Sequence, residues 1–243
     1  MVTDTKQEGR FPHRYARLET IDAIGEEGVG RLRSGKVFIV GCGALGSMCA
    51  MYLAASGVGT IGIADYDTID ATNLQRQLFF SEDIIGESKV LHLAERMRAL
   101  NSEVNIIVYN EMVTASKGER IFRDYDFIID GSDNMSTKQM TSRVCEALGI
   151  PYCIGGVEGF SGQVMSWAPG HTGYGDLFGD RSPVCSGILP CTVAGVIGPA
   201  AGIIASCQAA EAIKFLTSAG TMLYDRLAMF DLFSASSSVL DVS

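Results

Sequence analysis

The sequence has no excess of positive charge: 19 lysines and arginines stand against 28 aspartates and glutamates, which gives a formal net charge of −9. A nucleic acid or an anionic membrane surface would need a basic face, so we expect neither as the main partner. Any phosphate that the chain binds must therefore be met by a local cluster of cations.

Targeting and membrane signals are also missing. The first residues show no basic stretch followed by an apolar one, and no apolar run free of charges is long enough to span a bilayer. The most apolar segment, 193–216, carries Glu211 and Lys214 and therefore predicts a buried helix. The seven cysteines are scattered along the chain. This fits a reducing compartment, and we expect a cytoplasmic protein.

No linker divides the 243 residues, and a hydrophobic share of 47% is enough for one sizeable core. Short apolar runs alternate with helical segments, which predicts an α/β fold: a Rossmann-like, mostly parallel sheet with helices on both faces, extended by C-terminal strands. We expect a single domain. Its parts are a helical arm at 10–35, a nucleotide-binding core at 36–154, a mobile crossover loop at 168–192, and a C-terminal helix and strand at 193–243, followed by a polar tail.

The individual elements follow from the same periodicities. The expected strands are 37–40, 60–64, 105–109, 127–130, 151–154 and 222–233, with a strand pair inside 155–167; the expected helices are 26–32, 45–56, 89–100, 116–124, 136–148 and 196–216.

The first strand breaks at once into the glycine turn, GCGALG, at residues 41–46. Gly41 permits the tight turn, Gly43 lets backbone N–H groups approach a phosphate, and Gly46 lets the next helix pack closely on the strand. The following strand ends at Asp65, at about the distance, roughly 20 residues, at which an acidic residue accepts hydrogen bonds from ribose hydroxyls. The stretch predicts a nucleotide site without selecting the nucleotide.

Two cations follow that a plain dinucleotide site does not need. Arg76 can hold two phosphate oxygens at once, and Lys89 supplies a mobile point charge. Lys89 could also be no more than the first-turn residue of the helix 89–100. The helix dipole disfavours a cation at that position unless something anionic binds nearby, which favours the functional interpretation.

A carboxylate and an amide, Asp133 and Asn134, follow the buried strand 127–130. Ligands of parallel sheets bind at the carboxyl ends of the strands. A carboxylate just before the helix 136–148 can equally be its N-cap, so these residues alone leave both roles open.

Taken together, these motifs resemble the ThiF/MoeB/HesA family of adenylyltransferases, which activate ubiquitin-like sulfur-carrier proteins, and more distantly the ubiquitin-activating enzymes. The resemblance implies ATP-dependent adenylation of the carrier's C-terminal glycine carboxylate, with release of pyrophosphate, for sulfur transfer in thiamine, molybdenum cofactor or related biosynthesis. It also implies a carrier ending in Gly-Gly as partner and a homodimer. The motifs that carry it, over roughly 14–231, are the glycine turn, Asp65-x-Asp67, Asn73-x-x-Arg76-Gln77, Gly86-x-x-Lys89, Asp133-Asn134 and Cys191-x-x-Ala194-Gly195.

The resemblance assigns roles to single residues. Asp133 becomes the ligand of Mg²⁺, while Asp130 stays a capping or supporting residue. Arg17 becomes a finger that reaches the ATP of the partner subunit; without the resemblance, it would be part of a solvated basic edge. Cys191 matches a cysteine that takes the carrier covalently in some members, although a cysteine is often only a small buried hydrophobe. The remaining residues implied to bind ATP are Gly41, Gly43, Ala44, Gly46, Asp65, Asp67, Asn73, Arg76, Gln77 and Lys89.

The chain departs from the family at a zinc site. Many members bind a structural zinc with one C-x-x-C pair in the long loop and a second near the C-terminus. This chain has GYGD at 173–176 and no cysteine after Cys207, so we expect no zinc.

Two other classes remain open. An NAD-dependent oxidoreductase would share the glycine turn and Asp65, but would leave the cations and Asp133 unexplained. A non-catalytic member, which would hold a partner enzyme in a heterodimer, would be expected to have lost one of the charged residues, and all of them are present. A differently specific member of the superfamily would adenylate another carboxylate.

Overall fold

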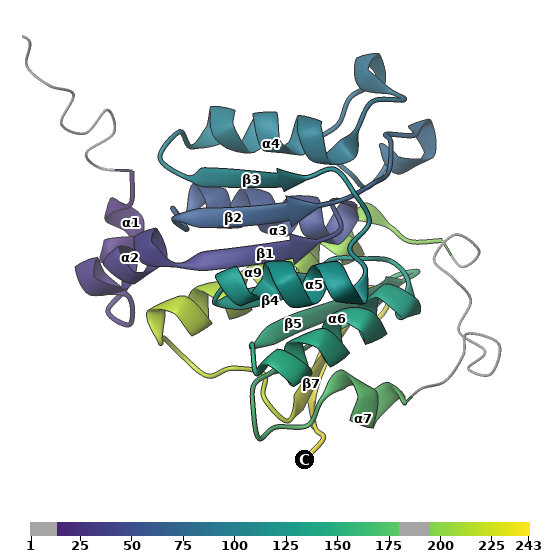
Figure 1. The fold of residues 1–243 in the computed structure, drawn as a ribbon. Helices are drawn as coiled ribbons and strands as arrows, with labels where there is room; N and C mark the ends of the chain where they lie inside the picture. Colours follow the sequence, from purple (N-terminus) through teal and green to yellow (C-terminus); the bar gives the residue numbers. More distant parts are fainter. Residues whose placement is uncertain (1–13, 180–194) are drawn as a thin grey trace, which may run out of the picture.

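The computed structural model describes residues 14–179 and 195–243 (Figure 1). Its frame is an eight-stranded sheet with the strand order β3-β2-β1-β4-β5-β6-β7-β8. The first five strands of this order (β3, β2, β1, β4 and β5) pair in parallel. The last three (β6, β7 and β8) extend the sheet by antiparallel pairing. The predicted Rossmann-like, mostly parallel fold is confirmed. The strands are β1 (Lys36–Val40), β2 (Thr60–Ala64), β3 (Asn105–Tyr109), β4 (Phe127–Asp130), β5 (Tyr152–Glu158), β6 (Ser161–Trp167), β7 (Arg226–Asp231) and β8 (Ser236–Asp241).

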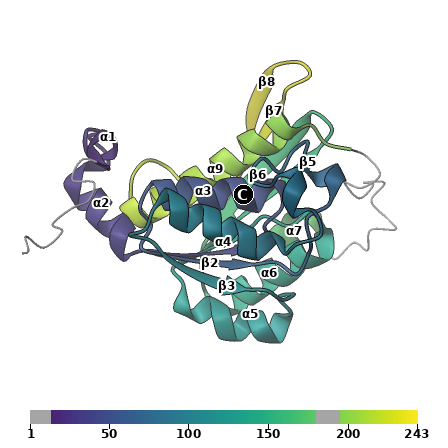
Figure 2. The same cartoon turned by 90° about the horizontal axis from the view of Figure 1, so that it is seen from above.

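Helices cover both faces of the parallel part of the sheet (Figure 2). Helices α3, α4 and α9 enclose one apolar cluster, and α5 and α6 enclose the other. The helices are α1 (Ala16–Glu19), α2 (Gly25–Ser34), α3 (Ala44–Ala55), α4 (Lys89–Leu100), α5 (Ala115–Ile121), α6 (Met135–Leu148), α7 (Tyr174–Phe178) and α9 (Gly198–Thr217), with 3-10 turns η1 (Ala71–Asn73), η2 (Glu82–Ile84) and η3 (Phe122–Asp124).

The central strands are buried on both faces because their sequences are nearly continuous apolar runs. In β1 every residue from Val37 to Val40 is buried, and β4 is buried throughout. Branched side chains such as Ile39 and Ile129 suit this two-sided burial. Because β2 and β4 both pair in parallel with β1, the carboxyl ends of the three strands meet at one edge of the sheet, where β1 passes into the glycine turn.

That edge is held together by glycines. Gly41 has φ +87°, a left-handed conformation that glycine adopts without strain. A Cβ on Gly46 would overlap the carbonyl oxygen of Gly41, and a Cβ on Gly131 would stand 2.7 Å from the Gly46 backbone. The glycine turn, the start of α3 and the loop after β4 are thus packed backbone against backbone.

Replacing Gly46 by alanine is therefore expected to destabilise the fold by about 3 kcal/mol or more, because rigid backbone cannot yield to the new methyl group. Gly202 is a matched control: it lies inside α9, and a Cβ there meets no atom of a described residue within 4 Å. Gly202→Ala should stabilise the protein by about 1 kcal/mol through helix propensity. Urea unfolding followed by circular dichroism measures both, and equal effects of the two substitutions would contradict the close packing.

Helix α7 and strand β8 were not predicted. Helix α7 lies inside the segment expected to be a loop, where Tyr174 is buried and its ring packs at a tilt against that of Phe178. Its glycine-containing sequence has a weak helix propensity, so packing forms it. Strand β8 replaces the expected polar tail. All six of its residues are exposed, and it follows β7 in antiparallel register from Arg226↔Asp241; a strand without a buried face has no periodicity to detect.

Smaller differences concern the ends of elements. Strand β5 continues through Gly155 and Gly156 and supplies the first member of the expected strand pair. Strand β7 is shorter than the expected 222–233. Helix α9 matches the predicted buried helix, and both Gln208 and Glu211 are buried in it. Within the two described ranges, no helix is long and apolar enough to cross a membrane.

Candidate active site

The glycine turn ends in a helix N-terminus without a side-chain cap. Gly43 is the N-cap of α3, and no side chain of the described residues caps this N-terminus. Nearby, the buried side chain of Gln77 places Nε2 3.6 Å from the position that a Cβ on Gly43 would take. Its Oε1 has no hydrogen-bond partner in the described part of the chain. Free backbone N–H groups, the helix dipole and an unpaired amide together make this point suited to an anion.

Asp65 links the end of β2 to the glycine turn. One carboxylate oxygen accepts a hydrogen bond from the N–H of Cys42 at 2.6 Å, and the other accepts one from the N–H of Asp67 at 2.8 Å. Burial raises the pKa of Asp65, and these N–H groups and Lys89 oppose that rise. Each oxygen retains an acceptor position for a ribose hydroxyl. The adjacent Cys42 is fully buried, and burial raises the pKa of its thiol, so it is not a nucleophile.

Lys89 is buried at the start of α4, with 6% of its surface exposed. Its ammonium pairs with the carboxylate of Asp67 at 3.1 Å, and its N–H donates to the Asp67 carbonyl. Asp67 thus already provides an anionic neighbour for a cation at a helix N-terminus. The dipole argument from the sequence is satisfied within the chain, and it does not by itself require a bound phosphate.

Arg76 and Asn73 lie beside the same edge of the sheet. Asn73 belongs to η1, where its side-chain oxygen accepts from the N–H of Asp70 at 3.3 Å. The Arg76 guanidinium donates to the carbonyl of Thr72 at 2.9 Å. A Cβ on Gly198 would meet the Arg76 backbone at 3.4 Å, so the start of α9 reaches this segment. The structure brings these predicted residues to one edge.

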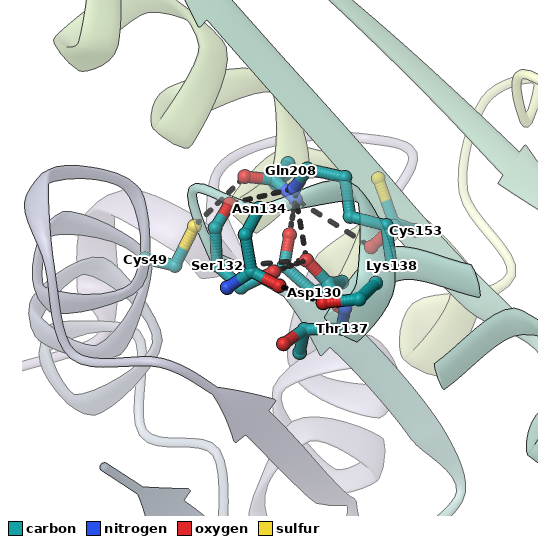
Figure 3. Close-up of polar contacts among 9 residues, drawn as sticks. Cys49, Asp130, Ser132, Asn134, Thr137, Lys138, Cys153 and Gln208 are labelled. Atoms are coloured by element: carbon teal, nitrogen blue, oxygen red, sulfur yellow. Dashed lines mark hydrogen bonds and ion pairs between the residues drawn. The ribbon is translucent and has the colours of Figure 1, made fainter. Parts of the chain in front are cut away.

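The loop after β4 presents Asp133 without using it as a cap. Asn134 is the N-cap of α6: its Oδ1 accepts from the N–H of Thr137 at 2.9 Å and from the Ser136 hydroxyl at 2.8 Å (Figure 3). Asp133 is exposed, and its carboxylate has no hydrogen bond to any described residue. The capping alternative for Asp133 is therefore excluded.

Asp133 fits a magnesium ion held mainly by phosphates. Mg²⁺ in nucleotide sites commonly takes one or two protein carboxylates together with phosphate oxygens and water. Among the described residues, no group of three or more histidines, cysteines, aspartates or glutamates could hold a metal ion. A single free carboxylate suits a metal that arrives with the nucleotide.

A pocket of about 710 Å³ opens on the other side of this loop. It is bounded by strands β5 to β8 and by parts of α6 and α7. Asp133 and the rest of the loop 131–134 line it, as does Leu45 from the first turn of α3. The loop also touches the glycine turn, since a Cβ on Gly41 would meet Gly131 and Ser132 backbone atoms at 3.2 Å. The loop 131–134 thus contacts the glycine turn and also lines the pocket.

Arg17 lies far from this edge in its own chain. Helix α1 and its neighbours sit where the strands begin, opposite the glycine turn (Figure 1). Arg14 donates to the carbonyl of Leu100, and Tyr15 accepts from Asn101, both at the far end of α4. Lys89, at the near end of α4, is about 18 Å away along twelve helical residues. Arg17 is exposed there, and the structure does not bring it to the other predicted residues.

Sequence analysis missed two residues of this site. Lys138 pairs with the buried Asp130, and Gln208 of α9 donates to the carbonyl of Asp130 at 2.8 Å. The signal was visible for Gln208, a polar residue within an apolar helix, but its partner 78 positions away was not. Cys191 and most of the expected crossover loop lie outside the described residues.

The fold and this edge define a Rossmann-like protein with an anion site next to a substrate-sized pocket. The ThiF family model matches residues 15–243. The chain belongs to the ThiF family, and the resemblance found in the sequence is confirmed.

Individual relatives agree. The adenylyltransferase and sulfurtransferase MOCS3 of Caenorhabditis briggsae is 39% identical over 220 residues, 90% of this chain and 54% of the relative. A probable molybdopterin-synthase adenylyltransferase of Gracilaria tenuistipitata var. liui is 33% identical over 225 residues, 92% of this chain and 62% of the relative. The chain thus spans between about half and 62% of these relatives. The structure of E. coli MccB with ATP superposes with a TM-score of 0.81 at 21% identity, covering 97% of this chain and 72% of MccB, which shows a shared fold.

Proposed function

We propose that this chain uses ATP to adenylate the C-terminal glycine carboxylate of a small ubiquitin-like sulfur-carrier protein and releases pyrophosphate. The observation that carries the proposal is the loop 131–134, which borders both the glycine turn and the pocket. A nucleotide with its phosphates at the turn and a peptide tail in the pocket would meet at Asp133. The names of the relatives, adenylyltransferases of molybdopterin synthase among them, support the same reaction.

The chemistry suits a site without a general base. A carrier carboxylate is ionised at neutral pH and can attack the α-phosphorus directly. The new bond joins a carboxylate oxygen to this phosphorus, the bond from the α-phosphorus to the bridging oxygen breaks, and its electron pair leaves with pyrophosphate. The protein must align the two reactants and balance the charge on the leaving group. The histidines His13, His92 and His171 need no part in this reaction.

Each site residue takes one task in this proposal. The backbone of the glycine turn, including Ala44 and Gly46, and the N-terminus of α3 hold the phosphates. Asp65 holds the ribose, and Asn73 and Gln77 orient oxygens. Mg²⁺, held at Asp133, would neutralise phosphate charge when it is bound with ATP.

Cations complete the charge balance. Arg76 and Lys89 stand beside the glycine turn, with Asp67 keeping Lys89 in place until phosphates arrive. A homodimer would supply the last cation, Arg17 of the partner subunit, because the chain's own Arg17 lies at the wrong end of the sheet. Cys191 stays a candidate for covalent transfer of the carrier.

The proposal is tested by magnesium-dependent exchange of labelled pyrophosphate into ATP, with and without ubiquitin-like proteins ending in Gly-Gly. We expect exchange with one carrier and at most traces without it. A molybdopterin-synthase-type carrier is the first to test, because one relative is named for that system; a thiamine-type carrier is the second. Tight ATP binding without exchange for any carrier would contradict the proposal, and saturable NAD binding in a fluorescence titration would favour an oxidoreductase.

A further inference from the structure

A buried ion pair lies directly beneath the loop that presents Asp133. Asp130 ends β4 and is fully buried, and Oδ1 of its carboxylate accepts from the Lys138 ammonium at 2.9 Å (Figure 3). Lys138, in the second turn of α6, is 7% exposed. Oδ2 of Asp130 has no hydrogen-bond partner among the described residues. A buried pair with an unsatisfied oxygen contributes little to stability compared with apolar residues of the same size.

The same pair holds Ser132 of the loop through three hydrogen bonds. The Lys138 ammonium donates to the carbonyl of Ser132 at 2.6 Å. Oδ1 of Asp130 accepts from the backbone N–H of Ser132 at 3.1 Å and from its hydroxyl at 2.7 Å. Ser132 is thus held on its carbonyl, its N–H and its side chain, and the next residue is Asp133.

The surroundings of the pair fix it in turn. Gln208 donates to the Asp130 carbonyl at 2.8 Å, and the N–H of Gly131 donates to the carbonyl of Val40 in β1 at 2.8 Å. Burial, and after it the charge of Asp130, raise the pKa of Tyr174 to about 12, so this phenol is neutral beside the pair. Among the described residues that line the pocket, Lys138 is the one cation. Both of its described hydrogen bonds go to the loop and to Asp130.

From this geometry we infer that Lys138 and Asp130 are positioning residues, which set the place of the Asp133 carboxylate without contacting the nucleotide. The inference rests on the proposed function, because it assigns a purpose to the position of Asp133 in binding Mg²⁺ with ATP. Outer partners that orient a metal-binding group commonly change metal affinity by about 10- to 100-fold.

The variants must separate positioning from folding. Lys138→Met alone leaves Asp130 charged and unpaired in the core, which could unfold the protein. The double variant D130N/K138M removes both charges and keeps the volumes. Lys138→Arg keeps the cation. Lys117→Met is the matched control: Lys117 pairs with Glu111 beside α5, on the same face of the sheet but away from the loop 131–134.

The measurement is the dissociation constant of ATP by calorimetry, with Mg²⁺ and with a chelator. In D130N/K138M we expect the gain in affinity that Mg²⁺ brings to fall about tenfold, while the affinity without Mg²⁺ stays the same. K138R and K117M should keep the gain. Hydrogen exchange of the Ser132 amide in the free protein should accelerate in D130N/K138M and not in K117M, because its acceptor is weakened.

A cycle with Asp133→Ala decides between positioning and direct contact. If Lys138 and Asp130 act through Asp133, the triple variant D130N/D133A/K138M binds Mg²⁺-ATP no more weakly than Asp133→Ala alone. Two results would overturn the inference and make Lys138 a direct contact. One is a loss of affinity in the triple variant that equals the product of the losses in D130N/K138M and Asp133→Ala; the other is an equal loss of ATP affinity in D130N/K138M when Mg²⁺ is absent. A wild-type protein that does not bind Mg²⁺-ATP would overturn the proposed function itself, and this outcome is visible before any variant is made.

Discussion

Asp133→Ala is expected to lower pyrophosphate exchange by about a thousandfold while leaving the fold intact. The side chain is exposed and has no hydrogen bond to a described residue, so its removal should change the free energy of unfolding by less than about 0.5 kcal/mol. The loss should appear in kcat, because the carboxylate is proposed to act on the charge that develops as pyrophosphate leaves. Asp133→Asn should behave in the same way, since an amide of the same shape lacks the charge.

The control for this prediction lies at the other end of the same strand. Asp124 is an exposed carboxylate in η3, just before β4. Asp124→Ala should retain full exchange activity, which would exclude a general effect of lost negative charge. Substantial exchange by Asp133→Ala at saturating Mg²⁺ would remove the metal assignment and leave the loop 131–134 with a structural role only.

The parts of this edge that the sequence predicted are those that depend on local pattern. Strands β2, β3 and β4 and helix α4 begin and end where the apolar runs and turn residues place them. Because the carboxyl ends of parallel strands meet, the positions of Asp65 and Asp133 near the glycine turn follow from the strands alone. The left-handed backbone of Gly41 and the close packing around Gly46 follow from the spacing of the glycines in the glycine turn.

What the sequence could not give depends on contacts between distant residues. Helix α7 forms because Tyr174 packs against α6, and β8 forms because it pairs with the edge of β7. Neither element has an apolar pattern of its own that the sequence could reveal. From the sequence, Lys89 at a helix N-terminus was expected to need a bound anion. The structure shows that the carboxylate of Asp67 already supplies this negative charge. Lys138 was missed because a lysine one turn inside a helix is usually solvated, and only the burial of Asp130 gives it a partner.

Mixing two inactive variants is expected to restore activity if Arg17 acts across a dimer. An arginine that stabilises phosphate charge is worth about 10³-fold or more in rate, so Arg17→Ala and Asp133→Ala should each be nearly inactive. In a mixed dimer, the site on the Arg17→Ala chain keeps its own Asp133 and receives Arg17 of the partner subunit. After subunit exchange, equal amounts should regain about a quarter of the wild-type activity, because half of the dimers are mixed and each has one intact site.

The geometry makes the alternatives separable in the same assay. Arg17 is exposed on α1, at the end of the sheet opposite the glycine turn, so it cannot serve its own site without a large movement of the arm. Mixing Arg17→Ala with the double variant R17A/D133A should restore nothing, because neither chain can donate the arginine. If the first mixture also stays inactive although sedimentation shows mixed dimers, a role in trans is excluded. If Arg17→Ala alone is fully active, the arginine belongs to a solvated basic edge, and Arg76 and Lys89 must balance the phosphate charge without it.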